Sequence, residues 1–195
     1  MIRIVALGDS TTAGTPGWLS PREAPPHGRG NEKSQYAYWL MRGRPEWEVL
    51  NRGVNGERSD QIRARFDEDV RAAGPRAVVI IAGVNDVYQG RDAAPVVEQL
   101  RWMYERAAGA GILVVAGSIV PYNTATPEQN DRMHEINAWI RGCGVAFADT
   151  RSAVAAAGSP DLLANTPDGL HPSPDGYRRM AEAIRPVLER VIGGA

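Results

Sequence analysis

The sequence predicts an α/β fold in which helices cover both faces of a parallel sheet, and three observations support this prediction. Short apolar runs rich in β-branched residues recur along the chain, and the clearest, residues 77–82, is apolar at every position, as in strands buried on both faces. Stretches with apolar residues three and four positions apart separate these runs. Strands that alternate with helices form parallel sheets. The 195 residues, 43% of them hydrophobic, suit one domain spanning residues 1–195.

The elements follow from the positions of the apolar runs and of the glycines and prolines between them. We expect five strands, at residues 2–7, 47–51, 77–82, 112–116 and 145–148. We expect six helices, at residues 34–41, 59–73, 93–109, 127–142, 152–157 and 174–192. The connection between the first strand and the first helix is long and rich in glycine and proline, so it is predicted to lack regular structure and to border the functional site.

The connections also restrict the order of the strands. Right-handed crossovers leave few arrangements, and among them we expect the flavodoxin-like order 2-1-3-4-5 within a three-layer α/β/α fold. That order makes the first three strands neighbours. The loops after these strands hold Ser10, Gly56 and Asn85. Ligands of open α/β sheets bind at the carboxyl ends of the strands, so three distant segments are expected to meet in one crevice.

The composition argues against several other classes of protein. A formal net charge of -1 provides no overall field that would attract nucleic acid. The single cysteine, Cys143, excludes an intrachain disulfide and a multi-cysteine metal site. No apolar stretch reaches the roughly 18 residues that span a membrane, and no signal-like segment is present. We expect a cytoplasmic protein; a leader removed from a longer precursor would leave no trace here.

A serine and a histidine stand where nucleophilic catalysis would need them. Ser10 follows the first strand directly, and His171 lies just before the last helix, three residues after Asp168. A serine hydroxyl is a poor nucleophile unless a base takes its proton, and a carboxylate near the imidazole would orient that base. The alternative is that these residues only form turns and helix caps.

Acyl transfer also needs donors for the oxyanion of its tetrahedral intermediate. The backbone N–H groups of Ser10 and Gly56 could supply two, because a residue without a Cβ lets the backbone approach a ligand closely. The side-chain amide of Asn85 could supply a third. Each residue also has a plain structural interpretation, Gly56 as a turn residue and Asn85 as part of a helix cap. The combination, at the ends of successive strands, favours catalysis.

Four segments, in this order along the chain, resemble the motif blocks of the SGNH (GDSL-type) hydrolases: residues 8–11, 51–56, 83–86 and 168–172. Together they span nearly the whole sequence. The resemblance implies a flavodoxin-like fold, ester hydrolysis through an acyl-enzyme, and no metal or organic cofactor.

The same resemblance implies roles for individual residues. Ser10 is the expected nucleophile, and Asp168 and His171 complete the triad. Ser10, Gly56 and Asn85 are the expected oxyanion-hole residues. Gly56 is preferred over the alternative, Gly53, because it matches the family's glycine position better.

Three further residues are candidates for substrate binding. Asp9 and Thr11 flank the expected nucleophile, and Trp18 lies in the long connection that follows, together with His27. Thr11 departs from the leucine that is usual at this position of the family. A threonine there resembles carbohydrate-deacetylating branches of the superfamily.

We therefore expect a serine ester hydrolase that acts on small or short-chain acyl esters. The alternatives within the family are a carbohydrate O-acetylesterase and a lysophospholipase or thioesterase. A more distant alternative is a flavodoxin-like binding module without catalysis, since one fold hosts many functions. Such a module gives no reason for the pair of Asp168 and His171. The expected partner is a small-molecule ester, without nucleic acid or a membrane span.

Overall fold

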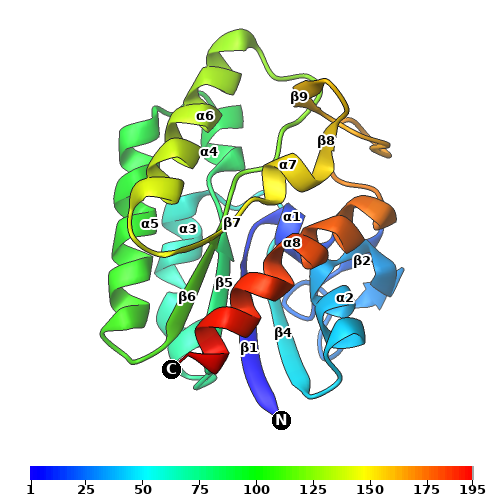
Figure 1. Cartoon of the computed structure of the whole chain (residues 1–195). Helices are drawn as coiled ribbons and strands as arrows, with labels where there is room; N and C mark the ends of the chain where they lie inside the picture. Colours follow the sequence, from blue (N-terminus) through cyan, green and yellow to red (C-terminus); the bar gives the residue numbers. More distant parts are fainter. Residues whose placement is uncertain (195) are drawn as a thin grey trace.

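The computed structural model describes residues 1–194, and a five-stranded parallel sheet forms its centre (Figure 1). The strands lie in the order β4-β1-β5-β6-β7, and every neighbouring pair is parallel. They are β1 (Ile2–Gly8), β4 (Trp47–Gly53), β5 (Ala77–Ile81), β6 (Leu113–Gly117) and β7 (Ala146–Ala148). Counted along the chain, this is the predicted order 2-1-3-4-5, and the predicted α/β class is confirmed.

Helices cover both faces of the sheet, which gives the three layers seen in Figure 1. One face packs against α3 (Ser59–Ala64), α5 (Ala93–Ala108) and α6 (Pro127–Gly142). The other face packs against α2 (Tyr36–Gly43), α7 (Thr150–Val154) and α8 (Pro174–Gly193). Within residues 1–194, no helix has the length and apolar character needed to cross a bilayer.

Side chains of the central strand β1 alternate between the two cores. Val5 and Leu7 belong to the core under α3, α5 and α6, whereas Ile4 and Ala6 belong to the core under α2 and α8. All four are fully buried. This is the two-fold alternation of a strand enclosed by two apolar layers, so β1 is held on both faces and by a strand on each side.

The structure adds short elements that the sequence pattern did not predict. Single helical turns follow β1 and β5 directly: α1 (Ser10–Ala13) and α4 (Val84–Tyr88). The predicted helix at 59–73 is divided, because α3 ends at Ala64 and a π-helical turn, η2 (Asp67–Arg71), follows. π-Helical turns inside helices often occur at functional sites.

Two segments contain small antiparallel ladders that the sequence pattern did not predict. The long connection holds β2 (Trp18–Leu19), β3 (Arg29–Gly30) and the 3-10 turn η1 (Glu32–Ser34). The helix predicted at 152–157 ends earlier, and β8 (Ala155–Ala156) then pairs with β9 (Ser159–Leu163). Turn residues predict loops for β2, β3 and β9, whereas the residues of β8 belong to the predicted helix 152–157 and are extended instead.

The last residue of β4 lies directly against α1, the turn that carries Ser10. A Cβ placed on Gly53 would stand 2.0 Å from the backbone nitrogen of Ala13. The Asn51 side chain bridges the same two segments, since its Nδ2 donates to the Ala13 carbonyl at 3.0 Å. Gly53 is therefore needed for close packing of two backbones, and this contact fixes α1 against the sheet.

We predict that Gly53→Ala lowers the free energy of unfolding by about 3 kcal/mol, because the added methyl overpacks a contact between two backbones. The matched control is Gly142→Ala near the end of α6, where an added Cβ meets no atom within 4 Å. That change is expected to be neutral or to stabilise by up to about 1 kcal/mol, since alanine is the better helix former. Urea unfolding measures both, and equal effects would contradict the packing argument.

Candidate active site

A chain of two hydrogen bonds joins residues from opposite ends of the sequence. The Nε2 of His171 lies 2.9 Å from the Oγ of Ser10. Its other ring nitrogen, Nδ1, lies 2.7 Å from the Oδ2 of Asp168. Ser10 begins α1 at the carboxyl end of β1, and His171 precedes α8, so 161 positions separate the two. This arrangement is geometrically able to move a proton from a hydroxyl to an imidazole that a carboxylate orients.

The loop that carries Asp168 and His171 is held by its own polar groups. The Oδ1 of Asp168 accepts hydrogen bonds from the backbone N–H groups of Leu170 and His171, both at 2.9 Å. The hydroxyl of Thr166 donates to the His171 carbonyl at 2.7 Å and accepts from the N–H of Gly169 at 2.8 Å. The loop is therefore ordered from within, which limits the orientations open to the imidazole.

The hydrogen bonds that Asp168 accepts favour its ionised form. Burial of the carboxyl raises its pKa, but the hydrogen bonds from the His171 ring and from the N–H groups of Leu170 and His171 outweigh burial, so the pKa lies below its usual value. A carboxylate that stays ionised is an acceptor for the N–H on Nδ1. That hydrogen bond leaves Nε2 free to accept a proton from Ser10.

The loops after β4 and β5 meet beside Ser10 and are joined by hydrogen bonds. Asn85 donates from Nδ2 to the Glu57 carbonyl at 2.9 Å. Asp86 accepts from both the backbone N–H and the hydroxyl of Ser59, at 2.8 and 2.9 Å. Gly56 directly precedes Glu57 in this turn and has φ +77, a left-handed conformation that favours glycine. One hydrogen of the Asn85 amide remains for a ligand.

A cleft of about 170 Å³ contains the serine and the histidine. It lies at the carboxyl ends of the strands, as predicted for a parallel sheet. Its lining residues are Ser10, Thr11, Asn55, Val84, Asn85, Tyr88, Tyr122, Leu170 and His171. Three of the predicted site residues, Ser10, Asn85 and His171, therefore line one cleft. Asp168 lies behind the histidine, and Gly56 follows Asn55 in the turn.

The sequence pattern did not predict the aromatic wall of this cleft. Tyr88 and Tyr122 meet edge to face with their ring centroids 5.7 Å apart. Tyr88 is 55% exposed, whereas Tyr122 is buried. Tyr88 lies three residues after Asn85 on one helical turn, and Tyr122 lies in the loop after β6. Both could have been found by extending the strand-end rule to every aromatic residue near these loops.

The three candidate substrate contacts lie in different surroundings. Thr11 lines the cleft. Asp9 is only 1% exposed and lies beneath α1, where its side chain caps the turn by accepting from the Thr11 N–H at 2.9 Å. Trp18 and His27 line another cavity, of about 380 Å³, beside β4. The long connection still reaches the Gly56 turn, because Glu23 accepts from the Asn55 N–H at 2.9 Å.

Burial changes the pKa of the Asp9 carboxyl. Desolvation raises its pKa to about 7, against the opposing effect of the hydrogen bonds from Thr11. Its Oδ2 has no hydrogen-bond partner among residues 1–194. Asp9 is therefore a buried helix cap whose ionised form is poorly solvated.

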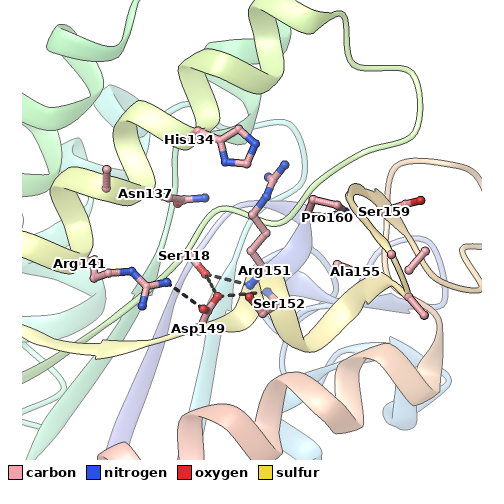
Figure 2. Close-up of a pocket in the computed structure, with 14 residues that line it drawn as sticks. Ser118, His134, Asn137, Arg141, Asp149, Arg151, Ser152, Ala155, Ser159 and Pro160 are labelled. Atoms are coloured by element: carbon pink, nitrogen blue, oxygen red, sulfur yellow. Dashed lines mark hydrogen bonds and ion pairs between the residues drawn. The ribbon is translucent and has the colours of Figure 1, made fainter.

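A larger cavity, about 520 Å³, lies elsewhere, between α6 and the β8–β9 ladder (Figure 2). It also contains a serine and a histidine, but these two residues form hydrogen bonds with different partners. Ser118 accepts from the Arg151 N–H at 2.8 Å, whereas His134 bonds to Asp161 at 2.7 Å. Asp161 also pairs with Arg151 at 2.6 Å. The serine and the histidine therefore bond to different residues, and this cavity holds no histidine-activated serine hydroxyl.

Known proteins of similar sequence and fold indicate the family of this protein. The sequence matches the model of the GDSL-like lipase/acylhydrolase family over residues 6–179. Because this match covers most of the sequence, the protein belongs to the GDSL-like lipase/acylhydrolase family, and it is an ester-hydrolysing enzyme. No match was found among curated proteins.

Solved structures of similar fold cover almost the whole chain. A GDSL-family lipolytic protein of Desulfitobacterium hafniense is 24% identical with a TM-score of 0.79, over 96% of this chain and 100% of that one. A lipase/acylhydrolase of Enterococcus faecalis is 20% identical, with a TM-score of 0.77 and coverages of 98% and 97%. The acetylxylan esterase Axe2 of Geobacillus stearothermophilus is 21% identical, with a TM-score of 0.71 and coverages of 98% and 94%. These likenesses establish the fold.

We predict that Asp9→Asn changes how stability depends on pH. The pKa of Asp9 rises from 3.8 to about 7 on folding, so between these values the folded state binds more protons than the unfolded state. The contribution of Asp9 to the free energy of unfolding therefore falls as pH rises through this range. Asparagine keeps the cap without a charge. The free energy of unfolding of Asp9→Asn, measured relative to wild type, should therefore be higher at pH 8 than at pH 5.

Urea unfolding at the two pH values measures this difference. The control is Asp131→Asn, at an exposed position of α6. A stability change in Asp9→Asn that is the same at both pH values would contradict the prediction.

Proposed function

We propose that the protein is a serine esterase in which Ser10 is the nucleophile and His171 the general base. The observation that carries this proposal is the 2.9 Å contact between His171 Nε2 and Ser10 Oγ, between residues 161 positions apart. His171 takes the hydroxyl proton as Ser10 attacks the ester carbonyl, and then gives it to the departing alcohol. Asp168 stabilises the imidazolium that forms. Water then hydrolyses the acyl-enzyme through the same base.

The oxyanion of the tetrahedral intermediate would be stabilised by three donors. They are the backbone N–H groups of Ser10 and Gly56 and the remaining amide hydrogen of Asn85. The Asn85 amide is already oriented by its hydrogen bond to the Glu57 carbonyl, and a donor held in place before the reaction stabilises developing charge most effectively.

The dimensions of the cleft favour short acyl groups. Its volume of about 170 Å³ lies below the 300–1,000 Å³ that is usual for pockets of drug-sized ligands. Val84 and Leu170 supply apolar wall beside the catalytic pair. An acetyl or similar small group fits such a site, whereas a long acyl chain would extend onto the surface.

We expect hydrolysis of p-nitrophenyl acetate to exceed that of p-nitrophenyl palmitate, because of this small cleft. Ser10→Ala should lower kcat at least about a thousandfold, since the nucleophile is lost. Its unfolding transition should stay close to that of wild type. Rates that increase with chain length would favour a lysophospholipase or thioesterase. Rates that persist in Ser10→Ala would exclude Ser10 as nucleophile.

A carbohydrate O-acetylesterase is the second candidate, and the exposed ring of Tyr88 favours it. Tyr88 stands at the rim of the cleft, 55% exposed and braced by Tyr122. A flat aromatic face beside the reacting centre suits a sugar ring in the alcohol part of an ester. Thr11 lines the same cleft, and one structure of similar fold is an acetylxylan esterase.

We predict that Tyr88→Ala raises KM for acetylated xylo-oligosaccharides by about tenfold, because an aromatic contact contributes about 0.5–1.5 kcal/mol beyond burial of its area. KM and kcat for p-nitrophenyl acetate should change less than twofold. Tyr88→Phe is the matched control and keeps the ring. Acetate release at varied substrate concentration measures both constants. An equal effect on both substrates would exclude Tyr88 as a sugar platform.

A further inference from the structure

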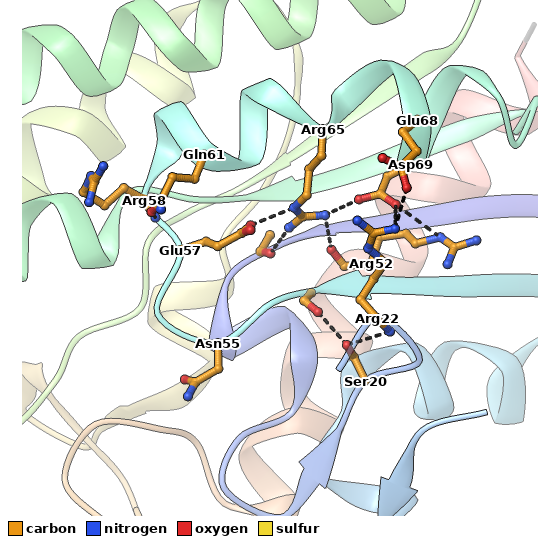
Figure 3. Close-up of polar contacts among 12 residues, drawn as sticks. Ser20, Arg22, Arg52, Asn55, Glu57, Arg58, Gln61, Arg65, Glu68 and Asp69 are labelled. Atoms are coloured by element: carbon orange, nitrogen blue, oxygen red, sulfur yellow. Dashed lines mark hydrogen bonds and ion pairs between the residues drawn. The ribbon is translucent and has the colours of Figure 1, made fainter. Parts of the chain in front are cut away.

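A buried guanidinium lies behind the loops that carry the proposed oxyanion donors (Figure 3). Arg65 follows α3 at its C-cap and is only 8% exposed. Its Nη2 donates to the Gly8 carbonyl at 2.8 Å and its Nη1 to the Arg52 carbonyl at 2.7 Å. Gly8 and Arg52 belong to the final residues of β1 and β4. One side chain therefore holds the ends of two neighbouring strands.

The same guanidinium also holds the turn after β4. Its Nε donates to Glu57 Oε2 at 2.7 Å. Glu57 directly follows Gly56, and its carbonyl is the acceptor that orients the Asn85 amide. Arg65 is thus connected to two of the proposed oxyanion donors through a single residue, and to Ser10 through the end of β1.

The turn that contains Gly56 has little packing of its own. Gly56 is exposed, and a Cβ built on it would meet no atom within 4 Å. The turn is held instead by side chains on each side of Gly56: Glu23 accepts from the Asn55 N–H at 2.9 Å, and Arg65 binds the Glu57 carboxylate. The position of the Gly56 N–H therefore depends on polar contacts, and the contact with Arg65 is partly buried whereas that with Glu23 is exposed.

A buried carboxylate balances the charge of Arg65. Asp69, in the π-helical turn η2, is 2% exposed and bonds to Nη1 of Arg65. Arg22 lies 3.5 Å from the same carboxylate. This neutralisation lets a guanidinium remain buried, so that its fork of donors is available to the strand ends and to Glu57.

We propose that Arg65 is a positioning residue for the oxyanion hole, acting through Glu57 on the Gly56 N–H and the Asn85 amide. This proposal rests on the proposed serine-esterase function. Arg65 touches neither substrate nor the reacting atoms. Its effect on the reaction is geometric, because donors displaced by about 1 Å stabilise the transition state much less.

A purely structural role and a positioning role predict different kinetics. If the Arg65 cluster only stabilises the fold, cutting the contact with Glu57 lowers stability but leaves kcat unchanged well below the unfolding temperature. If the contact positions the donors, kcat falls while KM is nearly constant, because the lost interaction acts in the transition state.

The test compares Glu57→Ala with Glu57→Gln on the short p-nitrophenyl ester that wild type hydrolyses. We expect Glu57→Ala to lower kcat about 10- to 100-fold with KM within twofold. Glu57→Gln should restore much of the loss, because its amide oxygen still accepts from Arg65. Glu68→Ala is the matched control, an exposed carboxylate in η2 that pairs with Arg22.

Two further variants make the result decisive. Asn85→Ala sets the upper limit, since removal of one oxyanion donor costs about 100- to 1,000-fold in kcat. Arg65→Lys keeps the charge but cannot form the fork, so it should lower kcat as Glu57→Ala does. Should Arg65→Lys fail to fold, Glu57→Ala still decides, because Glu57 is partly exposed.

A wild-type kcat in Glu57→Ala, together with loss of activity in Ser10→Ala, overturns the positioning role and leaves the esterase intact. Hydrolysis that persists in Ser10→Ala overturns the proposed function itself.

Discussion

The site depends on one constraint: β1 lies between β4 and β5 and is buried on both faces. Its last residue, Gly8, pairs with Gly53 on one side and Ile81 on the other. Parallel neighbours end at the same edge of a sheet, so the loops after all three strands must meet there. The proposed nucleophile and its proposed oxyanion donors come together because packing in the two hydrophobic cores fixes the position of β1.

This edge is also where buried backbone carbonyls need partners, and the chain provides them with charged side chains. Arg65 serves the carbonyls at the ends of β1 and β4, with Asp69 as its counter-charge. An unsatisfied buried polar group costs about 1–3 kcal/mol. The arrangement that stabilises the strand ends therefore also places the loops, which explains why folding and site geometry are difficult to separate here. Asp9 shows the opposite case, a buried carboxyl with one oxygen that finds no partner among residues 1–194.

The sequence was sufficient for the strand order and for bringing Ser10, Asn85 and His171 to one cleft, because the strand order follows from local periodicity and parallel strands end together. Contacts that depend on tertiary packing were not predictable. Arg65 belongs to a stretch with helical periodicity, where an arginine is usually exposed. Trp18 follows the proposed nucleophile closely, yet the β2–β3 ladder turns it toward another cavity. The end of α3 at Ala64 leaves no clear sequence signal, since no glycine or proline marks it.

The proposed base and its acidic partner lie on a single short loop. Asp168 and His171 are three residues apart, and the contacts that orient them, from Thr166 and from the loop's own N–H groups, lie in the same segment. Two hydrogen bonds connect this loop to distant segments: the one between His171 and Ser10, and the one from the Asn123 N–H to the Gly169 carbonyl at 2.7 Å. The acid and the base are thus oriented locally, within residues 166–171. Such a segment is suited to transplantation, because grafting it beside a serine on another α/β scaffold would require control of two distances, to the serine hydroxyl and to one backbone N–H.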